Sequence, residues 1–482
     1  MNLFQQCGYK PKKYLRTLLR YYFLNLSGYL KLGITILFNF YIINRDFYLG
    51  FLLLFFCLGI LLLRKVQVLK LKFTKRMIRL ITVILLSNIF ILFNYKLFVV
   101  ELYLIPLIII ICNFIILPIE RFIKRKYIKK AKEKLKFINP LVFGITGSFG
   151  KTTVKYFLYQ LLSDNYSACM SRKSYNTTMG LCKSILEDLK YGDEIYIAEL
   201  GACYKGDIHE LVKFVEPSIG VITDIGIQHI ESFKSIDNVL KTKLEILKSK
   251  NIHTLIINND NLYLKNFDYP KNLKVIRVGQ NEQSDVLIKN IITSFSETEF
   301  DIIYHNKFHI KTNILGMHNV MNLTLAFVLS CLCDVDQSEL IRKMNNIYMP
   351  NNRLEFKKVA NHTIIDNSFN SNVVGFKNNI DLLNKSKDYK VLITPGVVEL
   401  NKFSKQEHKL LAEYIINKID MVYLIENKNT LYMKDEFDKH NFINYYICDS
   451  FKQAFDLAIN NKIQSTILIE NDLTDYYMNG GI

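Results

Sequence analysis

The sequence predicts an α-helical membrane region followed by an α/β part that contains two domains. Long apolar runs and the whole basic excess of the chain lie in residues 1–136. From about residue 137 onward, strand-like apolar runs alternate with helical stretches, which is typical of a parallel sheet covered by helices on both faces. A glycine-rich turn follows the first of these runs, and ligands of such sheets usually bind beyond the carboxyl ends of the strands.

The net charge of +18 at pH 7 belongs to the N-terminal part of the 482-residue chain. Residues 1–136 carry 24 Lys and Arg against 4 Asp and Glu, whereas the remaining residues are slightly acidic. Because the globular part has no basic excess, no nucleic-acid partner is predicted. The nine cysteines include no C-x-x-C pair, so neither a zinc site nor a disulfide framework is predicted.

Four apolar runs lie in the N-terminal part: within Tyr21–Ile43, and at Phe47–Leu63, Ile78–Phe93 and Leu97–Leu117. A membrane-spanning helix needs about 20 apolar residues. The second and fourth runs satisfy this requirement, the third is slightly short, and Lys31 interrupts the first. Basic residues gather between the second and third runs and after the fourth, so four spans with both ends in the cytoplasm are predicted. Glu120–Lys136 would be a basic juxtamembrane helix lying on the lipid bilayer.

The segment from Leu141 to Thr153 reads L-V-F-G-I-T-G-S-F-G-K-T-T. Its apolar beginning predicts a buried strand, and the residues after Lys151 predict a helix. The turn between them would hold phosphate with backbone N–H groups and a helix N-terminus, although Ile145 stands where the standard P-loop has Gly. A simple surface turn is the alternative, which the strand and helix disfavour. The residues expected to contact ATP are Thr146, Gly147, Ser148, Phe149, Gly150, Lys151, Thr152 and Thr153.

Glu199 ends another apolar run, Ile195–Leu200. A carboxylate at the end of a core strand beside a phosphate loop suits Mg²⁺, which prefers one or two carboxylates together with phosphate oxygens and water. Glu199 could also simply end the strand, but its position beside the predicted phosphate loop favours the metal site.

The T-G-S-F-G-K-T-T loop resembles the ATP loop of the Mur ligase family, and it is most similar to that of the D-alanyl-D-alanine-adding branch. The likeness extends over about residues 137–482 through several ordered motifs. It implies a P-loop parallel-sheet ATPase domain at 137–348 and a smaller Rossmann-like C-terminal α/β domain at 349–482. Residues 1–136 would form the membrane region, with about four transmembrane helices in place of the family's UDP-binding domain.

Three further segments match the motifs that hold metal in this family. The A-E-L-G-A segment aligns Glu199 with a Mg²⁺ ligand, and T-D-I-G-I-Q-H aligns His229 with a histidine that helps to hold a second Mg²⁺. Lys243, in K-T-K-L-E-I, matches a lysine that is carbamylated in the family and then binds metal as an anion. The resemblance thus implies Thr152, Glu199, His229 and Lys243 as metal residues, and Lys151, Lys243 and His229 as catalytic residues.

The remaining matches concern nucleotide and substrate. G-M-H-N-V-M-N aligns Asn319 with an adenine contact, and Arg353 and Asp366 align with residues that approach the nucleotide from the C-terminal domain. Residues expected to contact substrate are Asn176, Thr177, Asn370 and Glu399. Around Asp366 the family's second Asp, Tyr and Pro are replaced by Asn367, Phe369 and Val373.

The resemblance implies an ATP-dependent ligase that forms an amide bond through an acyl phosphate. Its partners would be a cell-wall or cell-envelope precursor with a free carboxylate and an amino acid or dipeptide, and its cofactors ATP and two Mg²⁺ ions. With the membrane region, the expectation is a multi-pass protein of the cell membrane whose catalytic domains face the cytoplasm. A poly-γ-glutamate-type polymerising ligase and a catalytically weak nucleotide-binding membrane scaffold are the alternatives. The substrates and the oligomeric state stay open.

Overall fold

The computed structural model describes residues 73–89, 95–226, 230–350, 353–368, 373–397, 400 and 403–470, together with several positions between residues 4 and 17. The chain divides into two compact units, one made of Met1–Arg125 and Leu473–Ile482 and the other of Lys126–Asp472. The boundary between the units falls inside a long helix, α6 (Tyr95–Ile138), which is continuous through both.

The first unit contains α5 (Lys75–Ile89) and the N-terminal part of α6. Polar side chains connect the two helices, because Arg79 Nε donates to Glu120 Oε1 at 2.7 Å and Arg76 donates to Asn113 Oδ1 at 3.3 Å. A small apolar cluster packs beside these contacts, and its buried members are Phe4, Cys7, Tyr14, Leu80, Ile109, Ile110, Cys112 and Ile116.

The predicted α-helical membrane region is wrong. In the part of the chain that the structure describes, no helix has both the length and the apolar character needed to cross a membrane. The described part of the third run lies in α5, which has 15 residues. The fourth run continues without a break into the charged segment Glu120–Lys136 within α6. The first and second runs lie outside the described residues. The multi-pass localisation and the lipid-bilayer partner were inferred from the same runs and are overturned with them.

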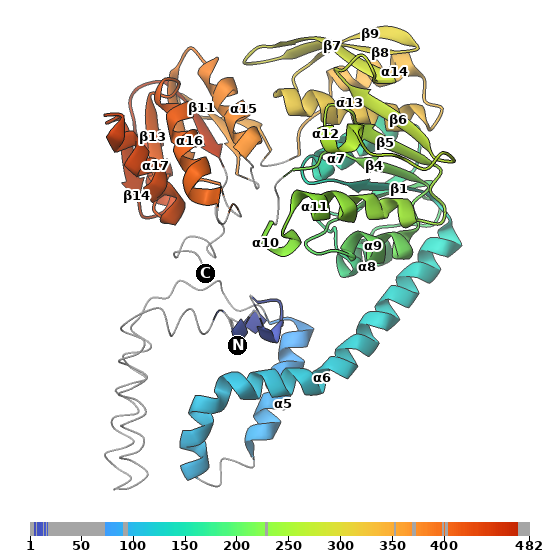
Figure 1. Ribbon diagram of the computed structural model, residues 1–482, viewed down its shortest axis with the longest axis vertical. Coiled ribbons are helices and arrows are strands. Elements are labelled where there is room, and N and C mark those ends of the chain that lie inside the picture. Colours follow the sequence, from blue (N-terminus) through green and yellow to red (C-terminus); the bar gives the residue numbers. More distant parts are fainter. Residues whose placement is uncertain are drawn as a thin grey trace. The chain divides into compact units, whose positions relative to one another are not determined.

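The second unit is built on a sheet of nine described strands in the order β2-β3-β1-β4-β5-β6-β7-β8-β9 (Figure 1). The strands from β2 to β7 pair in parallel, and β8 and β9 extend the sheet as an antiparallel ribbon. The alternation of strands and helices predicted a parallel sheet, and the structure confirms it. The strands are β1 (Leu141–Thr146), β2 (Ala168–Met170), β3 (Ile195–Glu199), β4 (Ile219–Ile222), β5 (Thr254–Asn258), β6 (Lys274–Gly279), β7 (Val286–Thr293), β8 (Thr298–Tyr304) and β9 (Asn306–Thr312).

Helices cover both faces of this sheet because its central strands are apolar on both sides. On β1, Phe143 and Ile145 belong to one core with α7 and α13, and Val142 belongs to a second core with α8, α9 and the end of α6. The helices are α7 (Lys151–Leu162), α8 (Thr178–Glu187), α9 (Asp207–Val215), α10 (Ile230–Phe233), α11 (Ile236–Lys243), α12 (Leu262–Lys265), α13 (Met317–Cys331) and α14 (Gln337–Asn345), with a 3₁₀ helix, η1 (Leu244–Lys248), directly after α11.

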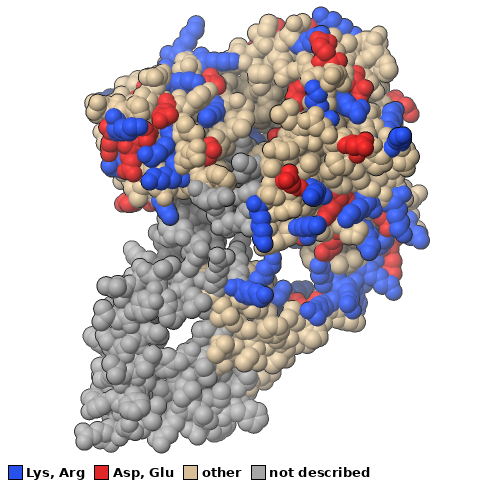
Figure 2. Space-filling view, viewed as in Figure 1, with Lys and Arg blue, Asp and Glu red and all other residues tan. Residues whose placement is uncertain are grey.

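The C-terminal half of α6 packs on the second core through Ala131 and Leu135. Lys132 Nζ lies 2.7 Å from Glu216 Oε1, and Lys134 Nζ donates to the carbonyl oxygen of Leu186 at 3.0 Å. The exposed lysines of this half contribute to the band of Lys and Arg along the lower edge of the domain in Figure 2. The basic segment is thus in part a packing element of the sheet domain.

A second sheet, of six described strands in the order β10-β11-β15-β12-β13-β14, forms the C-terminal domain. All neighbours pair in parallel except β10 and β11. Domain limits at 137–348 and 349–482 stay predictions. The elements are β10 (Glu355–Val359), β11 (His362–Asn367), α15 (Val373–Asn384), β12 (Tyr389–Thr394), α16 (Ser404–Ile416), β13 (Met421–Ile425), α17 (Lys428–Lys439), β14 (Tyr445–Cys448), α18 (Phe451–Ile459) and β15 (Ser465–Glu470).

The chain segment that leads to this domain is hydrogen-bonded to α7. The Gln160 side chain donates to the carbonyl oxygen of Tyr348 at 3.0 Å and accepts from the Tyr348 N–H at 3.1 Å. An amide side chain that makes both bonds with one residue holds the backbone of that residue in a fixed position. The last turn of α7 therefore fixes the chain just before it leaves the central domain.

Candidate active site

The loop between β1 and α7 depends on two glycines. Gly147 has a φ of 146° and Gly150 a φ of 80°, which L side chains rarely adopt. A Cβ at Gly147 would lie 2.1 Å from Thr223 Oγ1, and one at Gly150 would lie 2.4 Å from Asn322 Oδ1. The loop thus packs so closely against the end of β4 and against α13 that only glycine fits at these positions.

Residues that follow β4 hold the loop in place. The Ser148 N–H donates to the carbonyl oxygen of Asp224 at 2.8 Å, and Ser148 Oγ donates to the carbonyl oxygen of Gly226 at 3.2 Å. The Thr223 hydroxyl donates to the carbonyl oxygen of Phe149. The predicted loop residues are therefore brought together in one rigid turn.

Lys151 is the first residue of α7, and its side chain folds over the loop. Its Nζ donates to the carbonyl oxygens of Gly147 at 2.7 Å and Ser148 at 2.9 Å. Burial lowers the pKa of Lys151 to about 8, and the nearby Glu199 charge opposes this shift. Thr152 and Thr153 follow in the first turn of α7, and both are buried. An ammonium group beside the free N–H groups of a helix N-terminus is an arrangement that binds phosphate.

Glu199 ends β3, directly beside β1, and its side chain is 1% exposed. Its Oε2 lies 2.9 Å from Lys155 Nζ, and its Oε1 accepts from Asn176 Nδ2 at 3.1 Å. Burial raises the pKa of Glu199, but the charges of Lys155 and Lys151 together with the hydrogen bonds from Lys155 and Asn176 outweigh it, and the net shift is downward. Glu199 is therefore an ionised carboxylate held in one orientation by two donors.

Lys155 is a site residue that the sequence-based prediction did not include. It lies on α7 one turn after Lys151, its side chain is fully buried, and its Nζ also donates to the carbonyl oxygen of Lys173. The sequence does contain a sign of this pair, because Lys155 lies among residues that form the core, such as Val154, Phe157 and Leu158. A lysine is rarely buried without an acidic partner.

Lys243 is the last residue of α11, and only 1% of it is exposed. Burial, and then the charge of Lys151, lower its pKa well below the usual value. A buried amine with a lowered pKa is a common feature of functional sites. Lys151, Glu199 and Lys243 come from three separate elements, and electrostatic coupling through Lys151 connects all three.

The Mur ligase middle domain model matches residues 145–330, which include all of these groups. Residues 145–330 therefore form a Mur ligase middle domain, the domain of a family of ATP-dependent ligases. It is 28% identical over 323 residues to the UDP-N-acetylmuramoyl-tripeptide–D-alanyl-D-alanine ligase of Borreliella burgdorferi, which covers 63% of this chain and 68% of that protein. The ligase of the same name from Bacillus subtilis is 29% identical over 61% of this chain and 64% of its own length. The match thus spans about two thirds of these relatives.

Solved structures of Mur ligases share this fold. The MurF structure from Acinetobacter baumannii superposes with a TM-score of 0.65 and 21% identity over 72% of this chain and 77% of that chain, which establishes a shared fold. MurF from Thermotoga maritima, solved in complex with ADP, gives a TM-score of 0.64 with 26% identity over 72% of this chain and 80% of that chain. Mur ligases use ATP and Mg²⁺, and the glycine loop of this chain lies within the matched residues.

Two of the residues predicted to contact the nucleotide are held by other groups. Asn319 is 1% exposed, donates to the carbonyl oxygen of Leu315 at 2.8 Å and accepts from Asn322 at 3.2 Å. Asp366 lies 2.8 Å from Lys357 Nζ. Burial raises the pKa of Asp366, but the hydrogen bonds from Lys357 and Ser368 together with the Lys357 charge outweigh it and lower the pKa overall. Their contacts with ATP stay predictions.

Arg353 lies two residues before β10, and burial lowers the pKa of its guanidinium while the charge of Glu199 opposes that shift. Its own charge contributes to the lowered pKa of Lys151. The charge of Arg353 therefore acts on Lys151 at the phosphate loop. Its contact with the nucleotide stays a prediction.

The predicted substrate residues Asn176 and Thr177 have structural contacts. Asn176 orients Glu199, and its amide lies where a Cβ on Gly201 would be only 2.5 Å away. Thr177 accepts from the Gly180 N–H at 3.3 Å and caps α8. The predicted metal ligand His229 and the predicted substrate residues Asn370 and Glu399 lie outside the described residues.

The donors around the loop fit a magnesium nucleotide. Lys151 and the N-terminus of α7 offer a cation and N–H groups for phosphate. Glu199 is ionised and accepts one bond on each oxygen, so each oxygen retains a lone pair for a cation. A carboxylate with the Thr152 hydroxyl is the kind of donor set that Mg²⁺ takes between phosphates.

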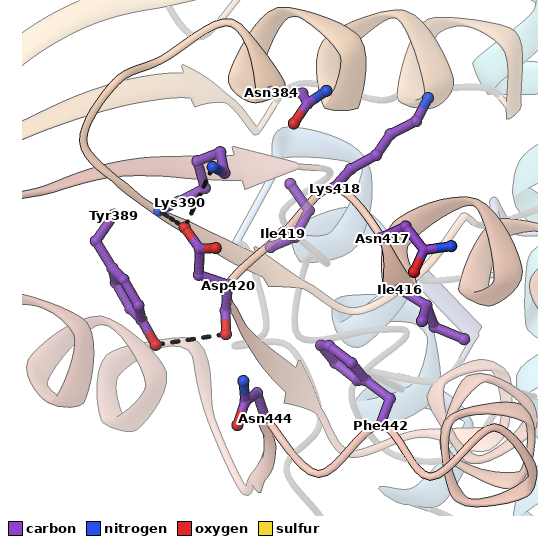
Figure 3. Close-up of a pocket in the computed structure, with 10 residues that line it drawn as sticks. All are labelled: Asn384, Tyr389, Lys390, Ile416, Asn417, Lys418, Ile419, Asp420, Phe442 and Asn444. Atoms are coloured by element: carbon purple, nitrogen blue, oxygen red, sulfur yellow. Dashed lines mark hydrogen bonds and ion pairs between the residues drawn. The ribbon is translucent and has the colours of Figure 1, made fainter.

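The C-terminal domain contains a pocket of about 360 Å³ (Figure 3). It lies at the amino ends of β12 and β13, where Tyr389 and Lys390 face Asp420. The Lys390 N–H donates to Asp420 Oδ2 at 2.7 Å. Asp366 lies at the opposite, carboxyl edge of this sheet, so the pocket is separate from the residues that the family comparison singles out.

Proposed function

We propose that this Mur ligase joins a dipeptide of the D-alanyl-D-alanine type to the free carboxylate of a UDP-linked muramoyl peptide, with ATP converted to ADP and phosphate. The names of the relatives state this pair of substrates for those proteins. The proposal rests on one observation above all: Lys151 begins α7 at the glycine loop, and its charge interacts with both Glu199 and Lys243.

In the proposed reaction the acceptor carboxylate attacks the γ-phosphorus of ATP, and ADP leaves with the electron pair of the broken P–O bond. The dipeptide amine then attacks the acyl carbon of the resulting acyl phosphate, and inorganic phosphate leaves as the amide forms. Lys151 would hold the β- and γ-phosphate oxygens and balance the charge that develops on them. Bound Mg²⁺ would reduce the charge of the phosphates, and Glu199 and Thr152 are the residues expected to hold it.

We further propose that Lys243 is carbamylated. Carbon dioxide reacts with a neutral amine, and the burial that lowers the pKa of Lys243 keeps the amine neutral over a wide pH range. The product is an anion that the Lys151 charge would attract. A buried neutral lysine beside another cation would thereby become a second carboxylate-like ligand for metal, in addition to Glu199.

Replacing Lys243 by Ala is expected to reduce amine-dependent phosphate release by about 10²–10³-fold, the usual effect of removing one charge-stabilising group. The assay would offer UDP-muramoyl tripeptide, a panel of amino acids and dipeptides, and bicarbonate. Lys241→Ala is the matched control, because Lys241 is exposed on the same helix. The Lys241→Ala variant is expected to release phosphate at the wild-type rate.

The amide product would be followed by mass spectrometry in the same reactions. Phosphate release that ignores every amine and yields no amide would rule out the ligase assignment. Products of increasing length would point instead to a polymerising ligase.

A further inference from the structure

We infer that Glu245 is a positioning residue that holds Lys243 in register with the loop that follows Glu199. This inference deepens the proposed function and rests on it, because it concerns the lysine that is proposed to carry the carbamate. Glu245 lies on η1, two residues after Lys243, and only 4% of it is exposed.

The carboxylate of Glu245 binds the N-terminus of α9 with both oxygens. Oε1 accepts from the Gly206 N–H at 3.0 Å, and Oε2 accepts from the His209 N–H at 3.0 Å. The N-cap residue, Gly206, has no side chain that could satisfy these N–H groups. Glu245 therefore supplies from a distant segment the cap that α9 lacks, and its charge is favourable at the positive end of the helix.

A second carboxylate connects the start of α9 to Glu199. Asp207 Oδ2 accepts from the N–H groups of Cys203 and Tyr204, each at 2.8 Å. Only three residues separate Cys203 from Glu199, and the Gly201 N–H in between donates to the carbonyl oxygen of Asn176 at 2.9 Å. The loop after Glu199 is therefore fixed to α9, and α9 is fixed to η1 through Glu245.

These contacts form one continuous path between the two groups proposed to hold metal. Lys243 and Glu245 lie at the junction of α11 and η1, so a shift of η1 away from α9 would move Lys243 relative to Glu199. Charge-assisted hydrogen bonds are about twice as strong as neutral ones, which suits a contact that sets a distance within a site. Glu245 acts on the backbone that carries Lys243 and touches no substrate in this scheme.

The test measures the carbamate itself. Protein incubated with ¹³C-bicarbonate would be titrated, and the carbamate carbon observed by NMR, with Lys243→Ala identifying the signal. Glu245→Gln is expected to raise the bicarbonate concentration needed for half-occupancy about tenfold, because the neutral side chain offers one acceptor and loses the charge. Glu216→Gln is the matched control. Glu216 caps the opposite end of α9 and pairs with Lys132. Carbamate occupancy of Lys243 in the Glu216→Gln variant is therefore expected to match that of the wild-type protein.

Thermal unfolding of each variant separates positioning from loss of fold. Unchanged occupancy in a folded Glu245→Gln protein would overturn the inference while leaving the proposed carbamate intact. If that variant does not fold, Asp207→Asn decides, since it weakens the same path and is expected to raise the bicarbonate requirement in the same direction. A wild-type protein without the Lys243-dependent signal would overturn the carbamate and this inference with it.

Discussion

Lys155→Met is expected to lower the free energy of unfolding by about 3–5 kcal/mol, the usual effect of removing one partner from a buried ion pair. Lys155 and Glu199 are almost completely buried, and Nζ and Oε2 lie 2.9 Å apart. Without the Lys155 ammonium group, the Glu199 carboxylate would lose its ion-pair partner and would remain as a buried anion. Urea unfolding followed by circular dichroism measures the loss.

Two comparisons make this result specific to the pair. Lys343 also fastens α7, through the carbonyl oxygen of Leu161, but its ion pairs with Glu339 and Asp164 lie at the surface. Lys343→Met is expected to cost about 1 kcal/mol or less. The double variant Lys155→Met/Glu199→Gln removes both charges of the pair, so it is expected to be more stable than Lys155→Met alone. If Lys155→Met and Lys343→Met lowered the free energy of unfolding equally, the Lys155–Glu199 pair would have no special role in stability.

Lys151→Met is expected to reduce ADP formation by about 10²–10³-fold while the protein stays folded. Among the residues that the structure describes, the side chain donates to two loop carbonyl oxygens, so its structural contribution is expected to be small. Its charge is proposed to hold the transferred phosphoryl group. ADP release and calorimetric binding of ATP measure the two effects separately.

The control for this variant is Lys205→Met, since Lys205 is exposed in the loop after Glu199. ADP formation by the Lys205 variant is expected to match that of the unmodified protein. A Lys151 variant with undiminished ADP formation would show that the glycine loop does not hold the reacting phosphates.

Local sequence patterns predicted the strand and helix on either side of the glycine loop correctly. The strand expected at 141–145 is β1, and the helix expected after Lys151 is α7. Such elements follow from a continuous apolar run and a glycine turn, which are both local features. Glu199 at a strand end was predicted for the same reason, and the structure places it at the end of β3.

The partner of Glu199 was not predictable in this way. Lys155 is 44 residues earlier in the chain, and the two meet because β3 pairs beside β1 while α7 crosses over them. The burial of Lys243 and the contact of Glu245 with α9 likewise depend on packing between distant segments. The membrane prediction was wrong for a related reason. Hydropathy counts apolar residues along a run, but it does not say where a helix ends or which charged segment the helix includes.

The side chain of Gln160 gives α7 a mechanical role. Lys151 begins this helix at the phosphate loop, and Gln160 grips Tyr348 at the other end, nine residues and roughly 13 Å away at 1.5 Å per residue. A helix of this length moves as a stiff rod. If a bound ligand tilted the first turn of α7, Gln160 would therefore move as well. Its two hydrogen bonds would shift the backbone of Tyr348, just before the chain enters the C-terminal domain.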